Sequence, residues 1–201
     1  MKKLAIDIVL LPPDEIMDLA IEQNRKLIVE GKEKIVLDKE KCLPHISLAM
    51  GVIDYVNLPT IGQNLDKIAK ETKSINLQIQ DTTIEKIPTN ELCPYFLIHA
   101  NDQIQELHEK IINKNLELLK WNAKNKMFFT PPEVEVADIW VNSYLNESSY
   151  ENYNPHITLG IGDLKDELSY PIEFTATRLA LCHLGNYCTC RKILYEKELR
   201  G

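Results

Sequence analysis

The stretches PHISLAMGV, at residues 44–52, and PHITLGIGD, at residues 155–163, repeat one pattern within a chain of 201 residues. Each reads Pro-His-Ile, then a hydroxyl residue and Leu, then a small residue, an apolar residue and Gly. Apolar residues that alternate with other types are typical of a half-buried strand. Two such strands in distant parts of one chain suggest either an accident of similar strands or two halves of one site.

Successive side chains of a strand point to opposite faces, so alternate residues share a face. One face of each copy would then present an imidazole, a hydroxyl and two small residues: His45, Ser47, Ala49 and Gly51 in the first, and His156, Thr158, Gly160 and Gly162 in the second. The other face is apolar and suits packing under helices. We expect the small residues to leave room for a ligand beside the polar side chains.

The shared polar face suits chemistry on a phosphate. Imidazole accepts or gives a proton near neutral pH, so two of them on opposite sides of a phosphodiester could act as general base and general acid. A hydroxyl two residues further along could donate to the non-bridging oxygens. One His-x-Thr on a strand is ordinary surface, but two matching copies predict a catalytic site made of His45, Ser47, His156 and Thr158.

The composition limits the classes of partner. A net charge of −7 does not favour a protein that grips long duplex nucleic acid through a basic stripe, although a small anionic ligand is compatible with it. No stretch approaches the length of a membrane span, and Asp7 interrupts the apolar run LAIDIVLL, so we expect neither a membrane anchor nor a secretion signal. The five cysteines, an odd number, indicate reduced thiols and a cytoplasmic protein.

Periodicity and punctuation predict an α+β protein with two similar halves. The expected elements, in chain order, are a strand at 4–11, a helix from Asp14 to near Gly31, a strand at 34–38, the first repeat, a helix at 59–71, strands at 75–80 and 95–100, a helix capped by Asp102 and ending near Lys120, the second repeat and a closing hairpin.

The pattern weakens at residues 121–154, which we interpret as an insertion or flap with a short helix at 138–145. Its aromatic residues could form a base-stacking lid or a small core that orders the segment, and the second is favoured. They are Trp140, Tyr144, Tyr150 and Tyr153.

The closing hairpin is expected to turn at Gly185-Asn186. With a two-residue turn, Tyr187 and Arg191 would share a face, where Arg191 could pair with a phosphate and Tyr187 could stack on a base. A solvent-exposed Arg and a packing Tyr are an equal alternative. The two residues are therefore candidate substrate-binding residues.

The stretch CHLGNYCTC gathers Cys182, His183, Cys188 and Cys190, but its spacing differs from that of common zinc sites. In the expected hairpin, Cys182 would face away from the other two cysteines. We therefore predict buried free thiols and no metal site. The remaining histidines, His99, His108 and His183, are assigned no catalytic role.

The two His phrases, the LPPDE turn after the first strand and the closing hairpin resemble the 2H phosphoesterases, a superfamily that includes bacterial 2'-5' RNA ligase-like proteins and cyclic phosphodiesterases. The resemblance covers most of the chain. It implies two pseudo-symmetric lobes whose antiparallel sheets face a central cleft, with helices on the outer faces. It also implies that His45 and His156 are the acid and base, that Ser47 and Thr158 hold the phosphate, and that no metal is obligatory. The first repeat has Ser where many members have Thr.

Together these features predict a single bilobal domain over residues 1–201 that acts as a metal-independent phosphodiesterase on 2',5'-linked or cyclic nucleotide phosphates. The expected partner is a small nucleotide or a short RNA end, with no cofactor, no membrane and no long duplex nucleic acid, and the protein is expected to be a monomer. The alternatives are RNA 2'-5' ligation, a nucleotide- or RNA-binding module without turnover, and a zinc-dependent interaction protein.

Overall fold

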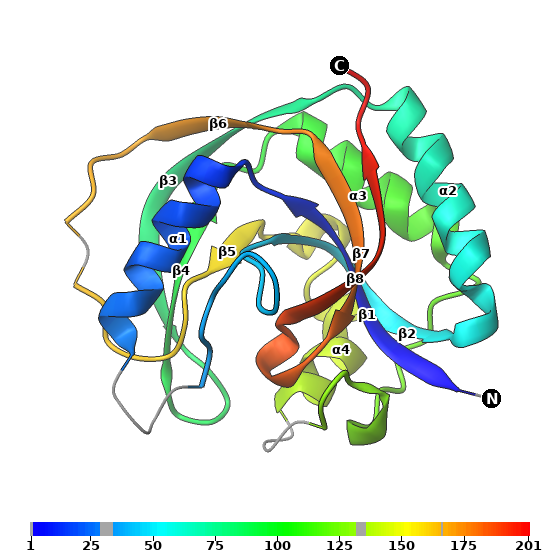
Figure 1. The fold of residues 1–201 in the computed structure, drawn as a ribbon, viewed down its shortest axis with the longest axis horizontal. Coiled ribbons are helices and arrows are strands. Elements are labelled where there is room, and N and C mark those ends of the chain that lie inside the picture. Colours follow the sequence, from blue (N-terminus) through cyan, green and yellow to red (C-terminus); the bar gives the residue numbers. More distant parts are fainter. Residues whose placement is uncertain (1, 29–33, 132–135, 166) are drawn as a thin grey trace.

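Two four-stranded antiparallel sheets form the framework of the computed structural model, which describes residues 2–28, 34–131, 136–165 and 167–201 (Figure 1). The first sheet has the order β2-β1-β7-β8, and the second has the order β5-β4-β3-β6. The strands are β1 (Lys3–Leu11), β2 (Ile46–Asp54), β3 (Ile75–Lys86), β4 (Leu92–Ile98), β5 (His156–Thr158), β6 (Ile172–Ala176), β7 (Arg178–Leu184) and β8 (Cys190–Glu198). The predicted α+β class with two similar lobes is confirmed, and in each sheet a repeated phrase forms the edge strand.

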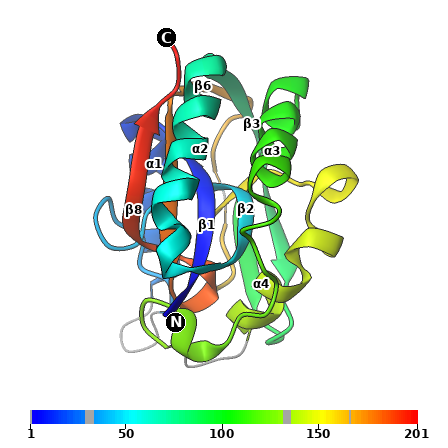
Figure 2. The same cartoon turned by 90° about the vertical axis from the view of Figure 1, so that its right-hand side faces the viewer.

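Four helices accompany the sheets: α1 (Asp14–Leu27), α2 (Leu58–Glu71), α3 (Asp102–Asn115) and α4 (Val136–Glu147). Helix α2 lies beside α3 and packs on β7 and β8, while α3 and α4 contact β2 (Figure 2). Single 3-10 turns occur at Tyr55–Asn57, Asn125–Met127, Tyr150–Asn152 and Asn186–Cys188. In the described ranges, no helix combines the length and the apolar character that crossing a membrane requires.

Strand β1 is buried on both faces, which explains why its sequence is apolar almost throughout. Ile6 and Ile8 point into the main core, which also contains Phe96 and Ile157 of the second sheet. Val9, on the other face, belongs to a second apolar cluster that includes residues of α4 and β7. A strand covered on both faces has no solvent side on which polar residues would alternate.

Several helix and strand boundaries differ from the predicted ones, because local hydrogen bonds determine where these elements begin and end. The residue that caps α3 is Asn101, whose side chain accepts from the backbone N–H of Ile104, so the prediction of Asp102 was wrong by one residue. The helix ends at Asn115 and not near Lys120. Residues 34–38 are irregular and not the predicted strand, and the backbone N–H of Leu37 donates to the side chain of Asn24. The predicted end of the first helix, near Gly31, falls outside the described residues.

The stretch IEFTATRLALCHL, expected as one strand of a hairpin, divides between the two sheets. Its first part is β6, which pairs with β3, and its second part is β7, which pairs with β1. Thr177 separates the two parts, so one nearly continuous segment crosses from the second sheet to the first (Figure 1). The segment therefore joins the two lobes directly.

The segment 121–154 is more ordered than an open loop. Its helix α4 is longer than the predicted 138–145 and contacts β2. Tyr144 and Tyr153 are buried in the main core, and Trp140 and Tyr150 pack against it. These positions fit the predicted small aromatic core.

Candidate active site

A β-bulge re-aims the side chains of the first repeat. Ser47 pairs with Val9 of β1, whereas Ala49 pairs with Ile8, so the register shifts by one residue between these pairs. Past the bulge, Met50 takes the face of Ser47, and Ala49 turns into the main core. The expectation that Ala49 and Gly51 would make room for a ligand was therefore wrong. A Cβ on Gly51 would lie 3.0 Å from Leu119, so this glycine allows close packing instead.

The second repeat leaves the sheet directly after its hydroxyl residue. Strand β5 ends at Thr158, and Gly160 and Gly162 have φ angles of +149° and +142°, a region that side-chain-bearing residues rarely adopt. A Cβ on Gly160 would lie 2.8 Å from Nδ2 of Asn24 in α1. These glycines allow the chain to turn and α1 to pack closely against it. The expectation that they would border the ligand space was wrong, because neither is among the described residues that line the cavity.

The four residues predicted to be catalytic line one cavity. It has a volume of about 400 Å³, and its lining includes His45, Ser47, His156 and Thr158. The cavity lies between the two edge strands, so each sheet supplies one imidazole and one hydroxyl. Drug-sized and nucleotide-sized ligands occupy cavities of roughly 300–1,000 Å³. The structure thus brings the two repeats together around a space of suitable size.

Both imidazoles are held by the same kind of hydrogen bond. Nδ1 of His45 donates to the carbonyl oxygen of Leu43 at 2.8 Å, and Nδ1 of His156 donates to that of Asn154 at 2.8 Å. Because a carbonyl only accepts, Nδ1 carries the proton in each neutral ring. Nε2 is then the basic atom of each histidine, and it is free of the backbone carbonyl that orients the ring.

Burial favours the neutral form of both histidines. Desolvation lowers the pKa of His45 to about 4, against the opposing bond to Leu43, and His156 nearby lowers it further. Desolvation also lowers the pKa of His156, with opposing contributions from Asn154 and from Glu85. Because the charges of the two imidazoles interact, the two rings titrate as a pair. One can act as the base and the other as the acid only when the pair carries a single extra proton.

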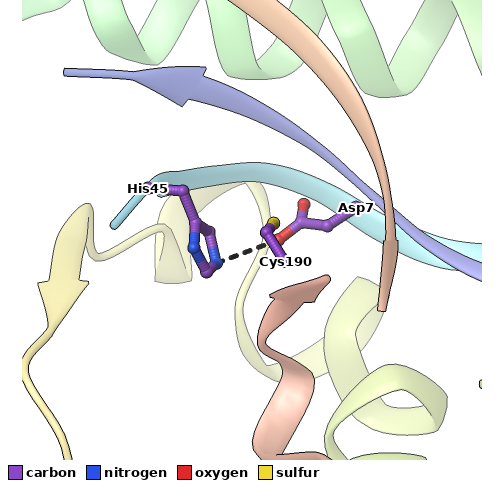
Figure 3. Close-up of side chains that lie close together, drawn as sticks. All are labelled: Asp7, His45 and Cys190. Atoms are coloured by element: carbon purple, nitrogen blue, oxygen red, sulfur yellow. Dashed lines mark ion pairs between the residues drawn. The ribbon is translucent and has the colours of Figure 1, made fainter. Parts of the chain in front are cut away.

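Asp7 is a residue of the site that the sequence analysis did not predict. It lies in the middle of β1 with no exposed surface, and Ser47 Oγ donates to its Oδ2 at 2.6 Å. The same Oδ2 lies 3.8 Å from Nε2 of His45 (Figure 3). Desolvation raises the pKa of Asp7 to about 7, although Ser47 and the backbone amide of Ala49 lower it. The available signal was a single carboxyl inside an apolar strand, which is costly unless it has a partner.

Tyr95 and Glu85 support His156 from the second sheet and were also not predicted. The rings of Tyr95 and His156 have centroids 5.0 Å apart. The hydroxyl of Tyr95 donates to Oε1 of Glu85 at 2.7 Å, and both residues line the cavity. Nothing in the sequence repeat pointed to them, because they belong to the neighbouring β3–β4 hairpin.

The two candidate substrate-binding residues of the closing hairpin are separated. The turn is longer than predicted, because Leu184 pairs with Cys190 and residues 185–189 connect the strands. Tyr187 lines the cavity, and its hydroxyl donates to Oε2 of Glu91 at 3.0 Å. Arg191 is not among the described residues that line the cavity, and its side chain packs against Gly185.

The cysteines are all free and buried, as expected, but their arrangement differs from the prediction. With the observed register, the thiols of Cys182 and Cys190 are hydrogen-bonded neighbours, so the expectation that they face apart was wrong. Cys188 donates to the carbonyl oxygen of Ala137, and His183 Nε2 bonds that of Met127. Cys182 and Cys190 therefore contact each other, while Cys188 and His183 have partners outside the CHLGNYCTC stretch.

His108 links the insertion to the first repeat. It is fully buried, its Nδ1 donates to the carbonyl oxygen of Leu48 at 2.7 Å, and its Nε2 accepts from the backbone N–H of Tyr150 at 2.9 Å. Its ring stacks on Tyr153, at 3.9 Å between centroids, and the Tyr153 hydroxyl donates to the carbonyl oxygen of Ser47. These contacts position the chain that leads into the second repeat against the strand that carries the first.

No family model matches this chain, and no curated protein does. Solved structures do match it over almost its whole length. TT0787 of Thermus thermophilus has a TM-score of 0.62 at 16% identity, covering 98% of this chain and 99% of that one. E. coli LigT complexed with 3'-AMP gives 0.58 at 12% identity, and a structure described as a phosphoesterase gives 0.60 at 12%, each covering 100% of both chains.

The chain shares its fold with E. coli LigT, TT0787 and the structure described as a phosphoesterase. The resemblance predicted from the two repeats is thus confirmed at the level of architecture. At identities of 12–16%, the likeness concerns the fold alone.

Proposed function

We propose that this chain is a metal-independent phosphodiesterase that acts on 2',5'-linked or cyclic nucleotide phosphates. The observation that carries the proposal is the matched pair of imidazoles, His45 and His156, on opposite edge strands of one cavity. One neutral Nε2 would take a proton from water or from a ribose hydroxyl. The other, protonated, would give a proton to the leaving oxygen. Ser47 and Thr158 would donate to the non-bridging oxygens of the phosphate.

Asp7 gives Ser47 a defined role in this scheme. The Ser47 hydroxyl has one proton, and in the free protein it points at Oδ2 of Asp7. A protonated Asp7 can donate to Ser47 Oγ instead, which releases the hydroxyl proton toward a phosphate oxygen. A pKa of about 7 makes the protonated carboxyl accessible near neutral pH. Asp7 would therefore act as a positioning residue for Ser47.

The size and lining of the cavity support a nucleotide as the substrate. Its volume of about 400 Å³ and its aromatic lining, with Tyr95, Trp140 and Tyr187, suit a base and a ribose next to the phosphate. The fold relative E. coli LigT has been solved in complex with 3'-AMP. A small nucleotide or a short RNA end is accordingly the proposed substrate.

The test is a turnover assay in EDTA with 2',3'-cyclic mononucleotides and 2',5'-oligoadenylate, in which the products are resolved by chromatography. We expect His45→Ala and His156→Ala each to lower kcat by about 10²–10⁴-fold, the usual contribution of a general acid or base. His99→Ala is the matched control, because His99 is exposed and lies outside the cavity lining.

Loss of turnover in both cavity variants, with the control unchanged, would support the proposal. Equal turnover in all variants would refute the site. Binding of an unchanged nucleotide without any product would favour the nucleotide-binding module, and the joining of RNA halves that end in a cyclic phosphate would favour the ligase.

A further inference from the structure

Three side chains of different types meet next to the cavity, and of these His45 lines it while Asp7 and Cys190 are fully buried. Asp7 of β1, His45 before β2 and Cys190 at the start of β8 bring one ligand atom each within 4.8 Å of one another (Figure 3). Figure 3 shows that the imidazole of His45 points at the carboxyl of Asp7 and that the Cys190 sulfur lies beside this carboxyl. Nitrogen, oxygen and sulfur ligands of these types are those that zinc prefers.

The three ligands are already held in place by the hydrogen bonds that metal ligands usually need. Leu43 accepts from Nδ1 of His45, which leaves Nε2 as the metal-binding atom, and Ser47 donates to Oδ2 of Asp7. The backbone N–H of Leu43 donates to the carbonyl oxygen of Cys190 at 3.1 Å. Leu43 therefore orients the imidazole of His45 through its carbonyl oxygen, and its backbone N–H links the segment before β2 to Cys190 of β8.

Charge and burial point to a cation as well. Asp7 and Cys190 have no exposed surface, and Oδ1 of Asp7 makes no hydrogen bond of ordinary geometry within the described ranges. A divalent cation would be neutralised by one carboxylate and one thiolate, and the neutral imidazole would complete three ligands. The free-energy cost of burying the cation together with its carboxylate and thiolate ligands is far lower than that of burying the carboxylate alone.

We propose that Asp7, His45 and Cys190 form a binding site for a thiophilic divalent cation such as Zn²⁺, and that the bound cation inhibits the enzyme. Zinc with three protein ligands leaves a fourth position for water or an anion. Of the three ligands, His45 is the one that lines the cavity. Binding releases to solvent the thiol proton of Cys190 and the carboxyl proton of any protonated Asp7, and it occupies the lone pair of Nε2 of His45, which then cannot carry a proton. The inhibitory part rests on the proposed function, whereas metal binding does not.

The site is tested first by binding and without reference to activity. Metal-free protein is titrated with Co²⁺, and thiolate ligation is read from the charge-transfer band in the near ultraviolet. We expect the band in the wild type and its loss in Cys190→Ser and Cys190→Ala, with affinity for Zn²⁺ reduced by at least about 10-fold. Two substitutions are used so that a folding defect in one, seen by circular dichroism, does not decide the result. Cys42→Ser is the matched control, because Cys42 is a buried thiol near Cys190 that belongs neither to the three ligands nor to the cavity lining.

The inhibition is tested next, by Zn²⁺ titration of turnover. We expect Zn²⁺ to inhibit the wild type and Cys42→Ser, EDTA to restore turnover, and Cys190→Ser to resist inhibition. No charge-transfer band in the wild type, or a band that survives in Cys190→Ser, would overturn the site. Equal inhibition of Cys190→Ser would overturn the inhibitory role. A band in a protein that turns over neither substrate would keep the metal site while contradicting the proposed function.

Discussion

The protonation state of the Asp7 carboxyl affects two residues of the proposed site, Ser47 and His45. It is completely buried, it accepts from Ser47, and it faces Nε2 of His45. A carboxyl in such a position is stabilised when it is neutral, because an isolated buried charge is costly. Both the stability of the fold and the state of the two histidines should therefore depend on pH.

The first prediction concerns stability. The pKa of Asp7 rises from 3.8 to about 7 on folding, so between these values the folded chain holds a proton that the unfolded chain releases. This contribution to stability is fully present below about pH 4, falls as the pH rises, and amounts to about 4 kcal/mol in total by the linkage relation. Urea unfolding at about pH 4.5 and 7.5 in EDTA should show a smaller change between the two pH values in Asp7→Asn than in the wild type.

Asp163→Asn serves as the control for this experiment, because Asp163 is exposed. Its pH dependence should match that of the wild type. A wild type that gains stability with rising pH relative to Asp7→Asn would mean that Asp7 is ionised and paired in the folded protein.

The second prediction concerns the pH dependence of turnover. Burial lowers the pKa of both His45, to about 4, and His156. The free enzyme holds one neutral and one protonated imidazole only between the two pKa values, so kcat/KM should be bell-shaped with its optimum on the acid side of pH 6.5. The profile of kcat should lie at higher pH, since a bound phosphate anion favours imidazolium. A flat kcat/KM profile between about pH 4 and 8 would contradict two-imidazole catalysis.

At the scale of secondary structure, one buried amide of α1 bonds both the second repeat and the segment that precedes the first repeat. Asn24 donates to the carbonyl oxygens of Leu159 and Ile35 at 2.7 and 3.0 Å, and accepts from the backbone N–H of Leu37 at 2.9 Å. Gly160 provides the space that this amide needs. The helix thus connects the end of β5 to the segment that leads into His45.

The third prediction follows from this connection. Asn24→Ala leaves three buried backbone groups without partners and should lower the free energy of unfolding by about 3 kcal/mol, at roughly 1 kcal/mol for each bond. Urea denaturation followed by circular dichroism measures the change. Glu22→Ala, on an exposed position of the same helix, should change stability by less than about 0.5 kcal/mol. If Asn24→Ala lowered the free energy of unfolding no more than this control, water would be replacing the hydrogen bonds of the Asn24 side chain.

Sequence patterns predicted those elements whose signal is local. The apolar stripe of α2 and the alternation of β3 predicted both elements, and the two repeats predicted the four cavity residues. The bulge in β2 could not be read from the sequence, because it depends on pairing with β1, and it reversed the expected faces of Ala49 and Met50. Likewise, β6 and β7 look like one strand until their separate partners, β3 and β1, are known.

At the scale of the whole molecule, the two sheets share one apolar core. Residues of β1, β2 and β7 pack with residues of β3, β4 and β5 in a single cluster. The segment of β6 and β7 belongs to both sheets, and the contacts of His108 join the insertion to β2. The main core is thus common to both sheets, whereas the second apolar cluster packs on the other face of the first sheet alone.

The fourth prediction is that the two lobes unfold together. Native-state hydrogen exchange in increasing urea should give amides of β1 and β4 the same free energy of opening and the same dependence on urea, since only a common unfolding event exposes both. Amides near the ends of α1 should open at lower free energy and serve as the internal reference. Two distinct values for β1 and β4 would mean that the lobes are separate cooperative units.

The crossing segment also has a consequence for biosynthesis. Strand β1 lies inside the first sheet between β2 and β7, so one of its edges stays unpaired until residues 178–184 have left the ribosome. The second sheet is completed only slightly earlier, when β6 at residues 172–176 is available to pair with β3. An unpaired apolar edge is a template for association with other chains. Nascent and truncated chains that end before β7 should therefore depend on chaperones, while the finished protein leaves no such edge on its first strand.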